Sequence, residues 1–273
     1  MHTIRSALFM PASNARAIEK ARSLACDAVI LDLEDAVAPE AKASARAQAL
    51  QAAADGGFGG RTLALRVNAL DSEWGIADCE AARDAGFDAV VLPKVSNPDD
   101  LSAARALLGD VPLWAMIETC AAMLALPAIA ATRGLECLIA GTNDLAKDMR
   151  CTPGADRLPL LPHLTAIVTA ARAHGLIALD GVSNVLAETP ELAAECAQGA
   201  AFGFDGKTLI HPAQIALANR AFAPSAERVA WAQAVITAFA QPENADKGAI
   251  RVNGEMVERL HLSEAERIVT LAR

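Results

Sequence analysis

Short apolar runs recur along the chain, and stretches with helical periodicity separate them. Most of these runs are continuous rather than alternating, which is typical of strands buried on both faces of a parallel sheet. Between the first two runs, Ile18, Ala21, Leu24 and Ala25 share one helical face. The expected strands span residues 7–10, 28–31, 63–67, 89–92, 113–117, 137–140, 176–179 and 201–204.

Two of the expected helices begin with clear start signals. Asn97 is followed by Pro98 and two acids, which supply an N-cap, a proline in the first turn and negative charge at the helix start. The segment Thr189–Pro190–Glu191 repeats this arrangement. Strands that alternate with helices favour an α/β protein, a closed (β/α)8 TIM barrel, with a doubly wound open sheet as the alternative.

The pattern changes from about Pro224. A helix over roughly 225–240 is followed by a polar loop, a short stretch at 250–260 and a last helix that a capping box of Ser263 and Glu266 opens. No core pattern is evident in this segment, so we expect it to pack on the barrel or on a neighbouring subunit. The expected domains are a catalytic barrel over 1–223 and a C-terminal helical extension or lid over 224–273.

Composition narrows the classes of partner. The chain has 273 residues, 53% of them hydrophobic, a formal net charge of −9 and no tyrosine. Negative charge and few aromatic side chains argue against nucleic acid and anionic membranes as partners. The six cysteines form no CxxC pair, and no apolar run reaches membrane-spanning length. We therefore expect a soluble protein of the reducing cytoplasm.

Chemically capable side chains follow nearly every expected strand. Because the carboxyl ends of parallel strands meet at one rim of a barrel, we expect a shared site there. Any one of these residues alone could instead be a helix N-cap or a loop charge. The set comprises Asp32, Glu34, Asp35, Arg66, Asn68, Lys94, Glu118, Asp144, Asp180, Asp205 and Lys207.

This set is rich in carboxylates and has one central arginine. Several carboxylates cannot all stay ionised in a confined pocket without a cation. Histidine and cysteine are missing from these strand ends, which favours Mg²⁺ over softer metals. Arg66 is expected to pair with a substrate carboxylate beside the metal. Lys94 is expected to be a charged ion-pair partner rather than a Schiff-base amine, and His211 to cap a helix.

Seven blocks of sequence carry a family likeness. In order, they resemble the citrate lyase β-subunit-like family of the HpcH/HpaI aldolase/citrate lyase superfamily, which includes malyl-CoA and citramalyl-CoA lyases. The likeness covers about residues 4–222. The blocks are RSALFMPASN (5–14), LDLEDAV (31–37), LRVN (65–68), VLPK (91–94), MIET (116–119), GTNDLAKDM (141–149) and GFDGKTLIHPAQI (203–215).

The resemblance implies a (β/α)8 barrel that works as a homo-oligomer, a trimer or hexamer, with Mg²⁺ as its cofactor. Glu118 and Asp144 match the family's metal ligands, and Arg66 matches the arginine that holds the α-keto acid. The implied activity is a carbon–carbon lyase reaction of the aldol or Claisen type. Such an enzyme cleaves or forms a 3-hydroxyacyl-CoA, such as malyl-CoA or citramalyl-CoA, from an acyl-CoA and an α-keto acid.

The resemblance also assigns further substrate-side residues. Glu34 and Asp35 match carboxylates around the waters of the metal. Arg5 and the loops near Lys94 are implied to lie toward the CoA thioester. In the tail, Glu258 stands where the family has a catalytic aspartate that often reaches a neighbouring subunit's site.

The catalytic base is not settled by the sequence. Glu258 is the first candidate, although its side chain is one methylene longer and the family's following proline is missing. Asp35 is the second candidate. Two other functions stay open: a β subunit of a citrate lyase complex that acts on acyl-carrier-protein thioesters, and a binder of keto acid and Mg²⁺ with little lyase turnover.

Overall fold

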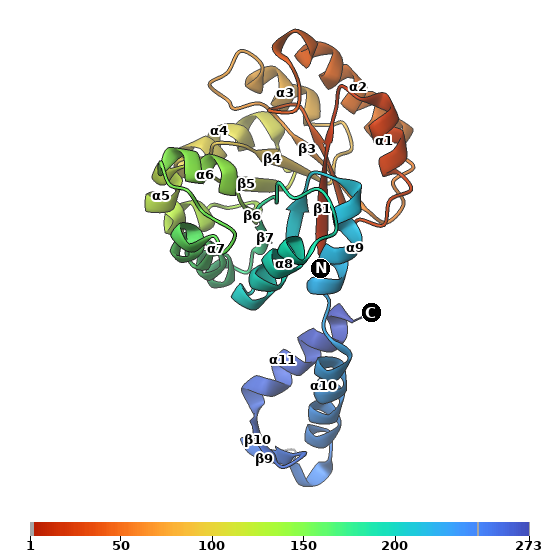
Figure 1. The fold of residues 1–273 in the computed structure, drawn as a ribbon, viewed down its shortest axis with the longest axis vertical. Coiled ribbons are helices and arrows are strands. Elements are labelled where there is room, and N and C mark those ends of the chain that lie inside the picture. Colours follow the sequence, from red (N-terminus) through yellow and green to blue (C-terminus); the bar gives the residue numbers. More distant parts are fainter. Residues whose placement is uncertain (1–2, 245, 273) are drawn as a thin grey trace. The chain divides into compact units, whose positions relative to one another are not determined.

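The computed structural model describes residues 3–244 and 246–272, and they form two compact units that divide between Phe222 and Ala223. In the first unit, strands β1 to β8 pair in parallel and in sequence order, and β1 closes on β8. Helices surround this sheet (Figure 1). The closed (β/α)8 barrel confirms the predicted fold class.

Each barrel strand is short and is followed by at least one helix. The strands are β1 Ser6–Pro11, β2 Ala28–Asp32, β3 Thr62–Arg66, β4 Ala89–Leu92, β5 Leu113–Ile117, β6 Leu135–Ala140, β7 Ile177–Asp180 and β8 Gly206–Leu209. The helices are α1 Ala15–Ala21, α2 Lys42–Asp55, α3 Gly75–Ala82, α4 Pro98–Leu108, α5 Cys120–Ala130, α6 Thr142–Asp148, α7 Leu161–His174, α8 Pro190–Phe202 and α9 Ile215–Ala221.

Alternate residues of each strand enter two different apolar clusters. Ala7 and Phe9 of β1 point into the barrel interior with Trp114, whereas Leu8 and Met10 pack in the cluster between the sheet and the helices. Burial on both faces explains why the strands read as continuous apolar runs. The interior is therefore a packed core, and a site has room at the strand ends.

The expected helix caps are present, but the eighth strand is not where the sequence pattern placed it. Asn97 accepts hydrogen bonds from Asp99 and Asp100 N–H, and Thr189 accepts one from Leu192 N–H. The apolar run at 201–204 falls at the end of α8 and in the turn that follows, and β8 is Gly206–Leu209 instead. The sequence pattern missed this strand because two of its four buried residues, Lys207 and Thr208, are polar.

The second unit contains α10 (Ala226–Phe239), the antiparallel hairpin of β9 (Ala249–Val252) and β10 (Glu255–Glu258), and α11 (Arg259–Leu271). It has a hydrophobic core of its own, which contradicts the expectation of none. The hairpin strands are too short for their alternation to stand out in the sequence. The buried residues are Ala232, Val235, Phe239, Ile250, Val252, Val257, Ala265 and Ile268.

The last helix starts earlier than predicted. Glu258 is the N-cap of α11, its carboxylate accepting a bond from the backbone N–H of His261. In return, Glu258 N–H donates to His261 Nδ1 over 2.9 Å. Ser263 therefore lies within the helix, where its hydroxyl donates to Leu260 O over 2.9 Å. The capping box expected from Ser263 and Glu266 is wrong.

Among residues 3–244 and 246–272, no helix has the length and apolar character needed to cross a membrane.

Candidate active site

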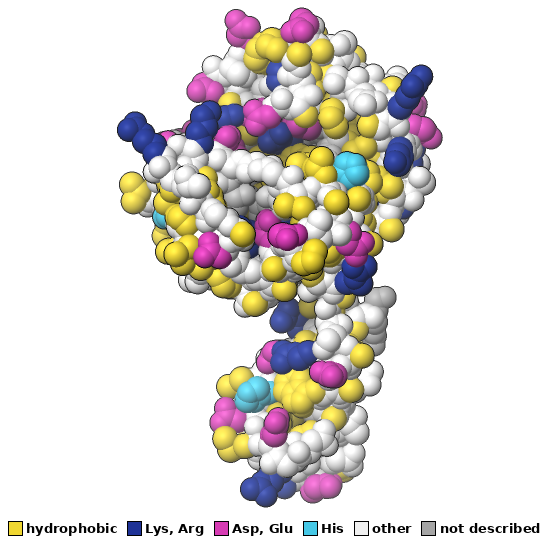
Figure 2. Space-filling view, in the orientation of Figure 1, with side chains coloured by type: hydrophobic (Ala, Val, Ile, Leu, Met, Phe, Trp, Pro, Cys, Tyr) yellow, Lys and Arg dark blue, Asp and Glu magenta, His cyan; other side chains and the backbone are white. Residues whose placement is uncertain are grey.

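A cavity of about 350 Å³ opens at the carboxyl ends of the barrel strands. Acidic and basic side chains lie side by side on the face of the barrel unit that Figure 2 shows, next to a hollow. Five of the predicted strand-end residues line this cavity together with the apolar side chains of Phe9, Met116, Val182 and Ile210. The five are Asp32, Asp35, Arg66, Glu118 and Asp144.

Glu118 follows β5 directly and is almost fully buried, with 3% of its surface exposed. The backbone N–H of Lys94 donates to its Oε1 over 2.6 Å. Its other oxygen lies beside Gly141, where a side-chain Cβ would come within 2.5 Å of Oε2 and 2.3 Å of the Glu118 Cβ. A glycine at the end of β6 is therefore required to leave room for this carboxylate. The sequence pattern did not reveal that role.

Asp144 enters the cavity from the next unit of the barrel. It lies in the first turn of α6, which begins one residue after Gly141, and its surface is partly exposed. Because β5 and β6 are neighbours in the sheet, the two carboxylates approach the cavity from adjacent elements. The predicted pair of acids thus shares one cavity wall.

Arg66 at the end of β3 is held by several groups at once. Its Nε and Nη2 donate to the two oxygens of Asp32 over 2.6 and 2.7 Å. Its guanidinium carbon lies 4.7 Å from the ring centre of Phe9, a cation–π contact. Burial opposes the charge of Arg66, but the bonds and charges of Asp32 and Glu34 outweigh it and raise the pKa. Asp32 therefore already occupies two of the three guanidinium nitrogens, and Nη1 is the nitrogen that remains for other partners.

Glu34, Asp35 and Lys94 extend this charged group. Glu34 Oε2 lies 2.9 Å from Arg66 Nη1, and its other oxygen pairs with the Lys94 ammonium. Burial raises the pKa of Glu34, although Arg66 and Lys94 oppose the shift. Lys94 is a charged ion-pair partner, as predicted. The Asp35 carboxylate is largely exposed and lies 4.0 Å from both Arg66 Nη1 and Lys94 Nζ.

The donor set of this cavity fits Mg²⁺. In the described ranges, no three His, Cys, Asp or Glu side chains are grouped to hold a metal ion. A pair of carboxylates suits Mg²⁺, which usually takes one or two protein carboxylates and fills its remaining positions with water and substrate oxygens. Burial raises the pKa of Glu118 to about 7, a shift opposed by the Lys94 N–H bond and reinforced by the charges of Glu34 and Asp144. A cation beside Glu118 stabilises the ionised carboxylate and so lowers its pKa.

We predict that Mg²⁺ binding is linked to deprotonation of Glu118. Its pKa of about 7 without metal means that Mg²⁺ must displace a proton below neutrality. The apparent affinity should rise about tenfold from about pH 6 to about pH 8, because the ionised fraction rises by about that factor. Calorimetry in buffers of different ionisation enthalpy measures the protons released. An affinity independent of pH, with no proton release, contradicts this linkage.

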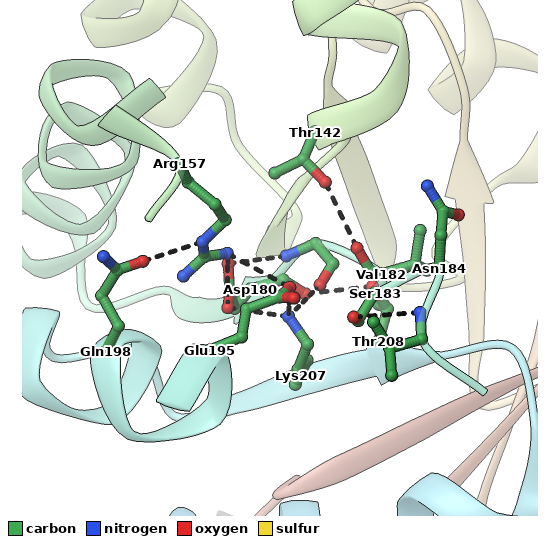
Figure 3. Close-up of polar contacts among 12 residues, drawn as sticks. Thr142, Arg157, Asp180, Val182, Ser183, Asn184, Glu195, Gln198, Lys207 and Thr208 are labelled. Carbon is green, nitrogen blue, oxygen red and sulfur yellow. Dashed lines mark hydrogen bonds and ion pairs between the residues drawn. The ribbon is translucent and has the colours of Figure 1, made fainter. Parts of the chain in front are cut away.

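Asp180 and Lys207 do not line the cavity. They lie fully buried in a separate ion network between the carboxyl end of β7 and the beginning of β8 (Figure 3). Lys207 Nζ lies 3.0 Å from Asp180 Oδ2 and 2.7 Å from Glu195 Oε1. Arg157 Nη1 donates to both Asp180 oxygens over 2.8 and 2.9 Å, and its Nε donates to Gln198. Burial alone would lower the pKa of Lys207, but these carboxylates raise it.

The network is adjacent to the cavity wall. Thr142 of α6 donates to Val182 O over 3.5 Å, and the neighbouring Asn143 exchanges amide bonds with Asn184 (Figure 3 shows Thr142 and Asn184). Thr142 and Val182 both line the cavity. The buried ions therefore anchor the loop after β7, against which the start of α6 rests. Arg157 and Glu195 come from a loop and a helix, and the strand-end rule could not find them.

Three other predicted residues lie away from the cavity. Arg5 precedes β1, at the amino end of the barrel, where its side chain donates to both oxygens of Asp27 over 3.0 Å. This position contradicts the expectation that it lies toward a thioester at the opposite rim. Asp205 precedes β8 and pairs with Arg172, so it too lies at an amino end.

Asn68 is buried, and its contacts are structural. Its side-chain amide and its backbone N–H both donate to Asp78 Oδ2, over 2.6 and 3.0 Å. Asp78 is itself fully buried and accepts a bond from Arg46 over 2.6 Å. Asn68 thus fixes the loop after β3 to α3 and is not in the group that lines the cavity.

Comparisons with known proteins agree with this fold. The chain belongs to the HpcH/HpaI aldolase/citrate lyase family, whose model matches residues 5–212. A protein of Cereibacter sphaeroides named (3S)-malyl-CoA thioesterase is 47% identical over 272 residues, which cover 100% of this chain and 95% of the relative. Human mitochondrial citramalyl-CoA lyase is 30% identical over 289 residues, which cover 98% of this chain and 85% of the relative.

A solved structure has the same architecture. CitE from Mycobacterium tuberculosis, in complex with magnesium, acetoacetate and coenzyme A, is 30% identical with a TM-score of 0.80. The match covers 98% of this chain and 97% of that one. A member of the family with this fold therefore holds magnesium in its crystals.

Proposed function

We propose that this chain is a Mg²⁺-dependent enzyme whose substrate is a CoA thioester of the malyl-CoA type, and that it hydrolyses the thioester bond. The observation that carries the proposal is the 47% identity, over the whole chain, to the (3S)-malyl-CoA thioesterase of Cereibacter sphaeroides. The cavity is compatible with it, because two carboxylates suited to Mg²⁺ and one arginine meet at its walls.

The residues of the cavity have distinct tasks in this proposal. Glu118 and Asp144 would hold the metal, which when bound would supply a Lewis acid and a positive charge for the hydroxy acid end of the substrate. Asp32 holds Nε and Nη2 of Arg66, so Nη1, which pairs with Glu34 over 2.9 Å, is the nitrogen left to bind the substrate carboxylate. Asp35 is largely exposed in the cavity and is the second candidate, after Glu258, to take a proton from the attacking water. Phe9 and Met116 supply an apolar wall.

Carbon–carbon cleavage is the second candidate. The observation that favours it is the 30% identity to human citramalyl-CoA lyase over 98% of this chain. Thioester hydrolysis and carbon–carbon cleavage both require the hydroxy acid end of the substrate to be bound in the same way, and they differ in the bond that breaks. In the lyase reaction, a base takes the proton of the 3-hydroxyl group, the bond between C2 and C3 breaks, and the acyl-CoA half leaves as an enolate that takes up a proton at C2. The products are then an acyl-CoA and an α-keto acid.

One substrate separates these functions. We propose an assay of (3S)-malyl-CoA with and without Mg²⁺, in which free CoA thiol and glyoxylate are measured in the same samples. Hydrolysis gives malate and one thiol per turnover without glyoxylate, whereas the lyase reaction gives glyoxylate and acetyl-CoA without free thiol. Turnover of acyl-carrier-protein thioesters alone identifies a citrate lyase type of subunit. Binding of Mg²⁺ and keto acid without turnover identifies a non-catalytic binder.

The role of Glu258 as a base shared between subunits stays a prediction, and the structure adds a second task for this residue. Its carboxylate caps α11, so Glu258→Gln retains an acceptor for the cap while it removes the base. If the site is shared, mixing Glu258→Gln with Arg66→Ala protomers should restore activity, because hybrids contain some complete sites. The same experiment tests the predicted homo-oligomer.

The outcome that opposes a shared site is equally clear. Glu258→Gln with full activity, and hybrids that recover nothing, leave Asp35 as the base and the cap as the whole role of Glu258. Glu258→Ala should then lower only the stability of the second unit, by about 1 kcal/mol, because a lost N-cap costs about that much. That the extension acts as a lid also stays a prediction.

A further inference from the structure

Lys94 has a backbone conformation that is unusual for its residue type. Its φ is 53°, in the left-handed region that non-glycine residues rarely adopt and that persists only where the surroundings impose it. Both ends of the residue are held, the main chain by a residue that lines the cavity and the side chain by a neighbour of Arg66. The N–H donates to Glu118 Oε1 over 2.6 Å, and the ammonium pairs with Glu34.

The backbone bond fixes which oxygen of Glu118 is available. Oε1 is taken by the Lys94 N–H, whereas Oε2 lies in the space that Gly141 leaves open. The peptide plane that carries this N–H lies between Pro93 and Lys94. A residue at 94 that left the left-handed region would turn this plane, or the chain that follows it, away from its present course. The carboxylate would then lose its fixed orientation.

We propose that Lys94 is a positioning residue, which orients Glu118 for Mg²⁺ through its main chain. The side chain contributes by tying residue 94 to Glu34, which is itself held 2.9 Å from Arg66 Nη1. One residue thus connects the metal side of the cavity with the arginine side. This inference rests on the proposed function only in that Mg²⁺ binds at Glu118.

A different role is possible for a lysine at this place, because its charge alone could act on the cavity. The two roles predict different results for substitutions that all remove the ammonium. If charge alone matters, every neutral residue at 94 has the same effect. If the backbone matters, residues that tolerate the left-handed region retain Mg²⁺ affinity and the others lose it.

The experiment compares Lys94→Gly with Lys94→Val in the full chain, with Mg²⁺ alone titrated by calorimetry. We expect Lys94→Val to bind Mg²⁺ about tenfold more weakly than Lys94→Gly, since the left-handed conformation is open to glycine and costly for a β-branched residue. Lys94→Asn should resemble Lys94→Gly. The same pair at Arg150, whose φ is 56° and whose N–H donates to Lys147 O, should show no difference.

Equal Mg²⁺ affinities of the glycine and valine variants overturn the proposal. Should Lys94→Val fail to fold by circular dichroism, Lys94→Ala makes the same comparison, with an expected loss of about fivefold relative to Lys94→Gly. A wild-type chain that binds no Mg²⁺ is a distinct result. It removes the metal from the proposed function, and this inference falls with it.

Discussion

Gly141→Ala is expected to abolish Mg²⁺ binding while the barrel stays folded. The added Cβ would lie 2.3 Å from the Cβ of Glu118 and 2.5 Å from its Oε2, so the carboxylate must move. The backbone at residue 141 cannot move away easily, because the Gly141 N–H donates to Ile117 O over 3.0 Å at the β5–β6 junction. A displacement of about 1 Å at a reacting centre can cost about 100-fold, and we expect at least that loss of affinity and turnover.

Calorimetry with Mg²⁺ and the thermal midpoint together measure this effect. Gly60→Ala is the matched control, because a Cβ at Gly60 meets nothing within 4 Å. Glu118→Gln should lose Mg²⁺ binding to a similar degree without introducing any clash. Gly141→Ala with unchanged affinity means that Glu118 is not the ligand, or that its carboxylate moves freely in the cavity.

The barrel could be predicted from the sequence because its strands are buried on both faces. Continuous apolar runs such as those of β2 and β5 are distinctive. The position of β8 could not be predicted, because Lys207 and Thr208 are buried and hydrogen-bonded to partners that only the fold brings together. The core of the second unit could not be predicted either, because Ile250 and Val257 belong to four-residue strands that carry too few positions for a pattern.

The cavity was predictable to the extent that strand ends determine it. Arg66, Glu118 and Asp144 line one cavity because parallel strands bring their carboxyl ends to one rim. Side-chain directions were not predictable. Asp180 also ends a strand, yet it is fully buried in an ion network. Nor could the sequence show that Asp32 occupies two nitrogens of Arg66, since that depends on the register of β2 against β3.

The network of Fig. 3 is balanced in charge, and this balance explains how it can be buried. Lys207 and Arg157 carry two positive charges, and Asp180 and Glu195 carry two negative charges within 3.6 Å or less of them. Taking charges from water is costly, and only close partners with good hydrogen bonds offset it. Removing one member therefore does more harm than the loss of one contact, because a partner is left buried without its counter-charge.

We therefore expect Lys207→Met to lower the free energy of unfolding by about 3–5 kcal/mol, the usual cost of leaving a buried ion unpaired. Methionine fills the space of the lysine side chain but leaves one excess negative charge. Adding Glu195→Gln restores neutrality, since Arg157 and Asp180 remain as a pair, so the double variant should be more stable than Lys207→Met alone. Urea denaturation of the wild type, Lys207→Met and the double variant measures the free energy of unfolding of each.

The exposed pair of Arg220 and Glu188 is the control for this experiment. Their side chains are 63% and 50% exposed, and Arg220→Met should change stability by no more than about 1 kcal/mol. If Lys207→Met costs equally little, the network is hydrated and its charges are screened. If Glu195→Gln adds its full cost on top of Lys207→Met, the two residues act independently. Either result means that charge balance does not explain why these four ions remain buried beside the cavity wall.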